Sequence, residues 1–304
     1  MSLPASPTRT RRSVRGTAAL GVAAVLAGLG ACAPSDTGTT TTTPAATGSS
    51  SATTDACAKD QLKVRTPGKL TIGTDKPAYS PWFVDDDPTS GKGFESAVAY
   101  AVAEKLGFGK ADVTWTVAAF NTVIAPGPKP FDVDVNQVSI TEERRKNVDF
   151  SSGYYDVAQA LVTVKGSKVA GAKGIADLKG AKLGAQVGTT SYRTITEVIK
   201  PDAAPAVFDK NDDAKLALGN GQVDGIVVDL PTALYLAAAE IKDGVVAGQF
   251  EAGGTPEQFG MVLDKGSALT ACVSKAVDAL RADGTLDKLE TEWLTKENGA
   301  PVLK

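Results

Sequence analysis

The stretch SITEERRKNVDFSSGYY, residues 139–155, lies near the middle of the chain. Its first two residues are the last two of a segment, residues 131–140, that we predict to be a β-strand. Its charge run at 142–146 is typical of a solvated surface. On both sides of this stretch, short apolar segments alternate with stripes of helical spacing. Strands that alternate with helices indicate an α/β fold in which helices cover the sheets.

The individual elements follow from hydrophobic periodicity. Apolar residues spaced by three and four predict an amphipathic helix that runs from Phe94 and ends at Gly107, and a second helical stripe at 269–280. Besides residues 131–140, further strands are predicted at 69–74, 113–117, 161–164, 182–186 and 225–228. Asp132 and Asp134 are unusual residues for a buried strand.

The first 31 residues have the pattern of a secretory signal peptide. Four arginines precede an apolar run at 18–29, which is shorter than the roughly 20 residues that span a bilayer. The run ends in Leu29-Gly30-Ala31-Cys32, which resembles the lipobox of bacterial lipoproteins, so Cys32 is expected to carry lipid and to become the mature N-terminus. A plain signal peptide with a free thiol is the alternative. Arg11-Arg12 fits either a twin-arginine signal or a general basic region.

Residues 32–56 are expected to form a disordered tether. They are rich in Ser, Thr, Pro, Gly and Ala and offer almost no apolar surface for a core. A glycosylated stalk is the alternative. About 240 residues remain after this segment, enough for two modest lobes or one large domain.

Composition excludes several classes of function. The chain has a formal charge of −3, which becomes −7 once the four arginines of the signal are removed, and this argues against nucleic-acid binding. The absence of histidine excludes Ser-His-Asp and Cys-His catalysis and most zinc sites. We expect no cofactor. Cys57 and Cys272 suggest one disulfide in an exported chain, with free thiols or a metal pair as alternatives.

Six blocks of sequence, in order, are similar to the extracellular solute-binding proteins of polar amino-acid ABC importers, the glutamine- and histidine-binding group. The blocks cover residues 70 to 295. Six blocks in the same order are far more specific evidence of a resemblance than any single block. The blocks are Gly73-Thr74-Asp75 with Tyr79-Ser80-Pro81-Trp82; Gly93-Phe94-Glu95; residues 139–144 with 148–151 and 153–155; residues 175–180 with Gly188-Thr189-Thr190; residues 221–224 with Asp229-Leu230-Pro231; and residues 280–286 with Trp293.

This resemblance implies a two-lobed α/β fold of the periplasmic-binding-protein type (type II), with a ligand cleft between lobes joined by two crossovers. Lobe one would hold residues 69–156 and 260–304, and lobe two residues 160–252. The hinges would fall at 155–159 and 253–259. The sequence Gly253-Gly254-Thr255-Pro256 is independently suitable for a hinge, because glycine tolerates the dihedral changes of closure.

The resemblance also implies how an amino acid would be held. Arg144 matches the position that binds the α-carboxylate, for which the planar guanidinium is suited. Asp229 matches the acid that binds the α-ammonium, although a helix cap is an equally good interpretation of its local sequence. Ser139 and Thr190 match hydroxyl positions beside the ligand backbone, and such residues more often cap turns. The less favoured alternatives are Arg145 for the cation and Asp156 and Asp224 for the acid.

The ligand side chain would lie among a second group of residues. Tyr79 and Phe120 match two aromatic positions that sandwich it, with Trp82 nearby, and Asp75, Gln137 and Gln186 match positions that face it. The chain departs from the family pattern here, because Gln137 replaces a small residue and one extra residue separates Asp75 from Tyr79. The segment after Gly93 also lacks the usual pair of acids. These polar groups favour glutamine, asparagine or a basic amino acid.

The expected function is therefore that of a substrate-binding component of an importer. The protein would be exported, anchored by lipid on the outer face of the cytoplasmic membrane, and monomeric, with a permease and its ATPase as partners. Two alternatives remain open at this stage. A ligand sensor could share the cleft, and some proteins of this fold are dehydratases, for which Glu95 or Glu142 would be the candidate acid or base.

Overall fold

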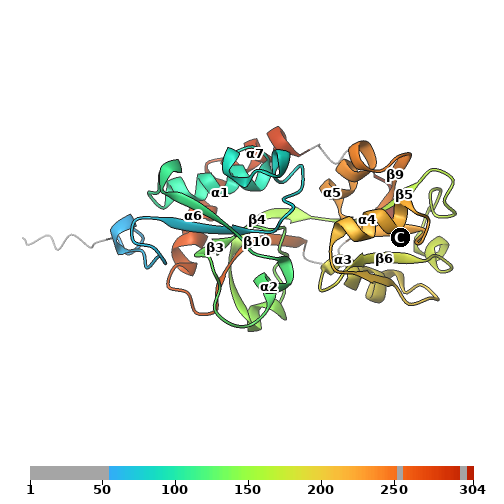
Figure 1. Ribbon diagram of the computed structural model, residues 1–304, viewed down its shortest axis with the longest axis horizontal. Helices are drawn as coiled ribbons and strands as arrows, with labels where there is room; N and C mark the ends of the chain where they lie inside the picture. The colour runs from blue at the N-terminus through green and yellow to red at the C-terminus, as the bar shows by residue number, and fades with distance from the viewer. Residues whose placement is uncertain (1–54, 252–255, 295–299) are drawn as a thin grey trace, which may run out of the picture. The chain divides into compact units, whose positions relative to one another are not determined.

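Two β-sheets, each with its own helices, organise the chain (Figure 1). The computed structural model describes residues 55–251, 256–294 and 300–304. The predicted signal peptide, Cys32, nearly all of the predicted tether and residues 252–255 of the second predicted hinge lie outside the described residues. No helix within the described ranges is long and apolar enough to cross a membrane.

Lobe one is built on a five-stranded sheet. Its strands lie in the order β2 (Val113–Val117), β1 (Leu70–Thr74), β3 (Val133–Asp134), β10 (Glu257–Asp264) and β4 (Val148–Val157). β1 is parallel to β2 and β3, whereas β10 is antiparallel to β3 and β4. The helices of this lobe are α1 (Phe94–Lys105), α2 (Phe120–Ile124), α6 (Thr270–Ala282) and α7 (Thr285–Trp293).

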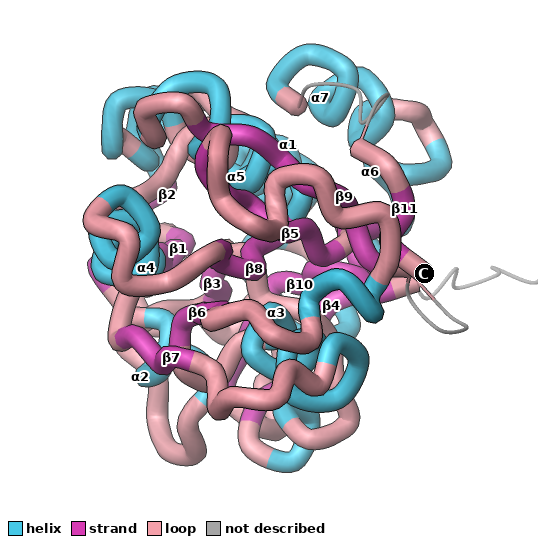
Figure 2. The backbone as a smooth tube through the Cα atoms, turned by 90° about the vertical axis from the view of Figure 1, so that its right-hand side faces the viewer, coloured by secondary structure: helices cyan, strands magenta, loops and turns pink. Residues whose placement is uncertain are grey.

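Lobe two is built on a six-stranded sheet that can be followed across Figure 2. The order is β11 (Val302–Leu303), β9 (Gly244–Phe250), β5 (Gln159–Val164), β8 (Gly225–Asp229), β6 (Leu183–Gln186) and β7 (Ala206–Phe208). Its helices are α3 (Thr190–Arg193), α4 (Asn211–Gly219) and α5 (Leu230–Tyr235); π-helical turns at Thr194–Ile199 and Leu236–Glu240 continue α3 and α5. The expected two-lobed α/β fold is confirmed.

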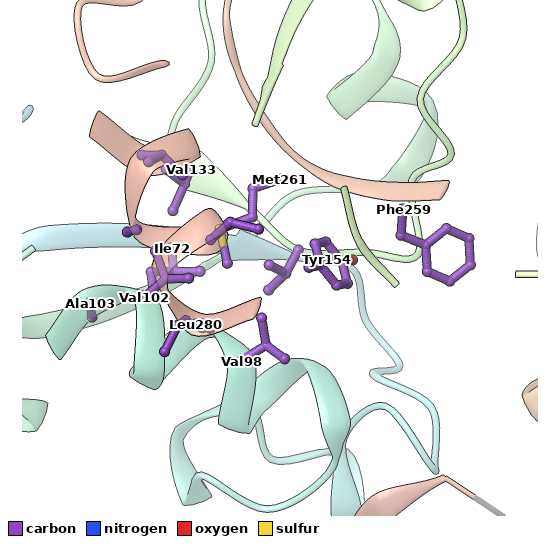
Figure 3. Close-up of a cluster of buried hydrophobic side chains, with 14 of the residues drawn as sticks. Ile72, Val98, Val102, Ala103, Val133, Tyr154, Phe259, Met261 and Leu280 are labelled. Atoms are coloured by element: carbon purple, nitrogen blue, oxygen red, sulfur yellow. The ribbon is translucent and has the colours of Figure 1, made fainter. Parts of the chain in front are cut away.

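Each sheet is covered on both faces, as its sequence pattern requires. In lobe two, alternate residues of β5 enter different clusters, with Leu161 on one face and Ala160 and Val162 on the other. In lobe one the larger cluster packs α1 and α6 against the sheet through side chains such as Val98, Ile72 and Leu280 (Figure 3). The periodic apolar stripes in the sequence are thus the helix faces that pack against the sheets.

The lobes are linked where strands of one sheet continue into the other. β4 of lobe one is separated from β5 of lobe two by Ala158 alone, and β9 of lobe two is followed by β10 of lobe one. These links fall in the segments expected to be hinges. The chain end adds a further connection that was not expected: residues 260–304 were assigned to lobe one, but β11 pairs with β9 in lobe two.

The C-terminal strand is firmly held in lobe two. Leu303 is buried in that lobe's core, and the backbone N–H of Gln249 donates to Pro301 O at 2.8 Å. The backbone N–H of Ile175 donates to Lys304 O at 3.1 Å. Burial of the apolar Leu303 and pairing with the otherwise open edge of β9 are the physical reasons for this placement.

Residues 131–140 form much less strand than their pattern predicted. Only Val133–Asp134 has ladder partners, and Gln137 has a φ of 48°, a backbone conformation that interrupts a strand. Asp132 is explained by the structure, since its carboxylate accepts the backbone N–H groups of Arg65 and Thr71, each at 2.7 Å. The segment is therefore largely a buried loop, which leaves the sheet after Asp134 and meets it again at Ser139, where an isolated antiparallel bridge joins Ser139 to Phe259 of β10.

A disulfide joins Cys57 to Cys272, with a Cα–Cα distance of 5.3 Å. Cys272 lies on the buried face of α6, and Cys57 packs against the same core. The bond ties the first described residues to lobe one.

Candidate functional site

One pocket gathers every residue that the sequence proposed for ligand binding. It is lined from both lobes by the nine candidates Asp75, Tyr79, Phe120, Gln137, Ser139, Arg144, Gln186, Thr190 and Asp229, together with Asn136, Thr189, Ser191, Asn211 and Val228. Asp75 follows β1, Gln186 ends β6 and Asp229 ends β8. The carboxyl ends of parallel strands are where open α/β sheets bind ligands, and the topology therefore brings these side chains together.

Arg144 is the cation of this pocket. It opens a short 3₁₀ turn after the loop at 139–143, and its side chain is buried. The guanidinium donates to Ser139 O at 2.7 Å and to Gly188 O at 2.9 Å, so it bonds to both lobes. Its centre lies 5.3 Å from the Phe120 ring. Burial lowers the Arg144 pKa to about 10, while the charges of Glu257 and Asp229 oppose that change, and Arg144 remains charged at neutral pH.

Arg145, its neighbour, lies on the surface. Its side chain forms an ion pair with Glu142 at 3.6 Å, and the Glu142 side chain is 94% exposed. Only one of the two adjacent arginines therefore reaches the pocket, and Glu142 is too far into solvent to act there.

Asp229 is the acid of the pocket on lobe two. It occupies the N-cap position of α5, yet its side chain makes no capping hydrogen bond. Instead, Oδ1 accepts from Gln159 Nε2 at 2.7 Å. Burial and then the negative charge of Glu257 raise the pKa of Asp229 to about 8, against the opposing effects of Gln159 and Arg144. The carboxyl group is thus mostly neutral at pH 7 until a cation arrives.

A polar network behind the pocket joins the two lobes. The Ser139 hydroxyl donates to the Glu257 carboxylate and lies 3.3 Å from Thr190 Oγ1, and Gln159 Nε2 lies 3.3 Å from the same atom. Thr189, not Thr190, caps α3 by accepting from Tyr192 N. Thr190 is therefore not the helix cap; it lines the pocket and belongs to the network with Ser139 and Gln159.

The other end of the pocket has a different character. Asp75 accepts from the backbone N–H groups of Lys76 and Phe120, at 2.7 and 3.0 Å, which leaves a carboxylate without an ion-pair partner among the described residues. Gln137 is held by Glu95, whose carboxylate accepts its backbone N–H and side-chain amide. These groups, with Gln186, can accept and donate several hydrogen bonds to one polar side chain.

The alternatives named from the sequence lie elsewhere. Trp82 is fully buried in lobe one and does not line the pocket. Asp224 forms an ion pair with Lys168 at 3.0 Å, and exposed Asp156 accepts from Gln258. Glu95 is buried against Tyr154 and Gln137; burial raises its pKa to about 7. No group of three or more metal-ligating side chains occurs in the part of the chain that the structure describes.

Glu257 and Gln159 were missed by the sequence analysis. Gln159 is one polar residue in an apolar strand, and Glu257 follows a segment rich in Gly and Pro. Their sequence neighbours give little signal, because the pairing of β5 with β8 brings Gln159 to Asp229, and the bridge between Ser139 and Phe259 of β10 brings Glu257 to Ser139. The polar residue inside the buried run of β5 was the one clue available.

The model of the bacterial extracellular solute-binding proteins, family 3, matches residues 70–296. The chain belongs to this family. Among curated relatives, the ABC transporter glutamine-binding protein GlnH of Bacillus subtilis is 31% identical over 216 residues, which are 69% of this chain and 76% of that protein. The resemblance seen in the six blocks is confirmed.

Solved structures agree with the fold. An ancestral arginine-binding protein bound to arginine has a TM-score of 0.61 at 33% identity and covers 75% of this chain and 99% of its own. An ancestral amino acid-binding protein, described as a precursor of cyclohexadienyl dehydratase, has a TM-score of 0.61 at 30% identity, covering 75% and 96%. The curated relative is named as a binding protein, and one of the two solved structures is described as the precursor of an enzyme.

Proposed function

We propose that this protein is the substrate-binding component of an amino-acid ABC import system, which captures a free polar L-amino acid between its lobes and delivers it to a membrane permease. The observation that carries the proposal is the pair Arg144 and Asp229. One lies in each lobe, and both line the same pocket. Arg144 is suited to bind a negatively charged group and Asp229 to bind a positively charged one. An α-amino acid needs both, because each of its charges loses water on burial.

The family relationship supports an amino acid as the ligand. The curated relative and the ancestral structure described above are named for glutamine and arginine. In this chain the side-chain end of the pocket presents the acceptor Asp75 and the amides of Gln137 and Gln186. A side chain that donates hydrogen bonds, as in glutamine, asparagine or a basic amino acid, is the best match.

Binding, rather than catalysis, is the better use of this site. A dehydratase requires an acid or base at the reacting atoms. Glu95 has a raised pKa, but its carboxylate already contacts Tyr154 and Gln137, and it does not line the pocket. Lipid anchorage through Cys32 and docking to a permease with its ATPase complete the proposal, together with a monomeric state.

The test is to remove each charge separately. Arg144→Ala and Asp229→Ala should each weaken binding by about 3–5 kcal/mol, a hundredfold or more, because one ligand charge is left buried without a partner. The control is Arg145→Ala, which lies outside the pocket and should change affinity little. A thermal-shift screen of the twenty amino acids identifies the ligand, and titration calorimetry then compares the variants.

The decisive outcome concerns Asp229. If the ligand identified for wild type binds Asp229→Ala within about threefold of wild type, an α-ammonium is not held there, and the amino-acid proposal fails. An acid without an amine would then be the better ligand class. Loss of binding in Arg145→Ala equal to that in Arg144→Ala would also contradict the assignment.

A further inference from the structure

Trp82 is packed tightly in lobe one and does not line the pocket, although it follows the pocket residue Tyr79 by three positions. Its ring is fully buried and makes edge contacts with Phe94, Tyr155 and Phe259, with centroids 6.1, 5.7 and 5.5 Å away. Gly93 allows this packing, since its φ is 96° and an added Cβ would lie 2.5 Å from Trp82 O. The indole therefore has little freedom to turn.

The indole N–H of Trp82 is directed at the other lobe. It donates to Thr232 Oγ1 at 2.9 Å, across 150 residues of sequence. Thr232 lies in α5 of lobe two, three residues after Asp229, and is 5% exposed. Neither partner lines the pocket. The two lobes are thus joined by a buried hydrogen bond that no ligand atom is needed to complete.

We propose that Trp82 and Thr232 form a latch that stabilises the closed arrangement of the lobes and so raises ligand affinity without touching the ligand. The inference rests on the proposed function, in which closure accompanies binding. When the lobes separate, both groups regain water, so the bond contributes to the closed state alone. Trp82 and Thr232 are positioning residues in this scheme.

The latch predicts an unequal effect of the two partners. Thr232→Val keeps the shape of the side chain but leaves the buried indole N–H without an acceptor in the closed state. The cost of an unsatisfied buried donor corresponds to a loss of affinity of roughly five- to hundredfold. Replacing Trp82 with Phe removes the donor itself. The double variant Trp82→Phe/Thr232→Val should therefore bind more tightly than Thr232→Val alone.

Three matched variants sharpen the experiment. Thr232→Ser keeps the hydroxyl and should bind within about threefold of wild type. Trp115→Phe removes another indole hydrogen bond, which Trp115 donates to Tyr100 OH at 3.1 Å inside lobe one, and should leave affinity unchanged. Selectivity between L-glutamine and L-arginine should be the same in Thr232→Val as in wild type, because the latch does not contact the ligand.

Titration calorimetry with L-glutamine or L-arginine, whichever gives wild type the larger thermal shift, measures these affinities. The latch is supported if Thr232→Val loses at least fivefold and the second substitution restores binding. It is overturned if Thr232→Val binds like wild type, or if the effects of the two single substitutions add without coupling. Either result leaves the proposed function intact, since wild type still binds the amino acid.

Failure of the proposed function gives a separate result. If wild type binds neither L-glutamine nor L-arginine, nor any other of the twenty amino acids, that function is contradicted. The latch is then judged by solution scattering of unliganded protein. A larger radius of gyration for Thr232→Val than for Thr232→Ser supports it, and identical curves overturn it.

Discussion

Asp229 combines two properties that act against each other in the absence of ligand. Its carboxyl lines the pocket, where we propose that it binds an ammonium group, but burial and the nearby Glu257 raise its pKa to about 8. An ammonium bound there would stabilise the ionised form and lower the pKa again. Ligand binding near neutral pH should therefore release a proton from the protein.

This coupling predicts that affinity rises with pH. Below the free-protein pKa of about 8, only a fraction of Asp229 is ionised and competent to bind, so the apparent dissociation constant should fall by roughly tenfold per pH unit between pH 6 and 7 and level off above pH 8. Calorimetry in buffers of different ionisation enthalpy counts the released proton. A flat profile across this range would contradict the assignment.

Glu257 should set where that transition lies. Glu257→Gln removes the charge that opposes ionisation of Asp229 but keeps an oxygen to accept from Ser139. We expect tighter binding at pH 7 and a pH midpoint displaced to lower pH. Exposed Glu251, which forms an ion pair with Lys304 at 3.1 Å, gives the control Glu251→Gln, expected to match wild type. An unchanged midpoint in Glu257→Gln would show that Glu257 does not act on Asp229.

At the scale of elements, two of the longer helices and the short strands β1, β2, β5, β6 and β8 were predictable from sequence, whereas the other helices were not. The helix predicted from Phe94 to Gly107 and the stripe at 269–280 correspond to α1 and α6, because their apolar spacing reflects one buried face each. The longer β4 and β10 were not predicted. They carry polar and small residues where they pass between the lobes, and their pairing is with each other, across more than a hundred residues.

The site residues divide in the same way, into those that neighbouring sequence identifies and those that only the tertiary structure brings to the pocket. Residues such as Arg144 and Asp75 sit in blocks whose order along the chain could be compared with a family. Glu257 and Asn211 had no such context, and their presence at or beside the pocket depends on how sheets and helices pair in space. Gln137 shows a further limit, since its positive φ is imposed by the loop and by Glu95, not by its own preference.

The disulfide between Cys57 and Cys272 joins two elements, since it fixes the first described segment to α6. It closes a loop of 215 residues, for which chain entropy predicts about 2–5 kcal/mol of stabilisation. The variant Cys57→Ser/Cys272→Ser should therefore lose unfolding free energy in urea while its ligand affinity stays near that of wild type, because neither cysteine lines the pocket. Equal unfolding midpoints for variant and wild type would contradict this.

At the scale of the whole molecule, the proposed attachment to a membrane depends on one residue, Cys32. Cys32→Ser should leave the protein unprocessed or release it from membranes, since the thiol is the only expected site of lipid attachment. Fractionation of cells followed by mass analysis of the mature N-terminus makes the comparison. Cys57→Ser/Cys272→Ser serves as the control for loss of thiols and should remain membrane-associated. Unchanged processing and membrane association of Cys32→Ser would contradict the anchor.

The position of β11 has a consequence for the order in which the molecule is made. Lobe one receives β10 only after all strands of lobe two but β11 have been synthesised, and lobe two receives Leu303 only after every strand of lobe one has been synthesised. Domains commonly fold one after another as they leave the ribosome. Here the edge of β9 and the core beneath it remain uncovered until residues 300–304 arrive. Each lobe therefore depends on a strand that is made after most of the other lobe, and neither lobe can finish folding before the other is nearly complete.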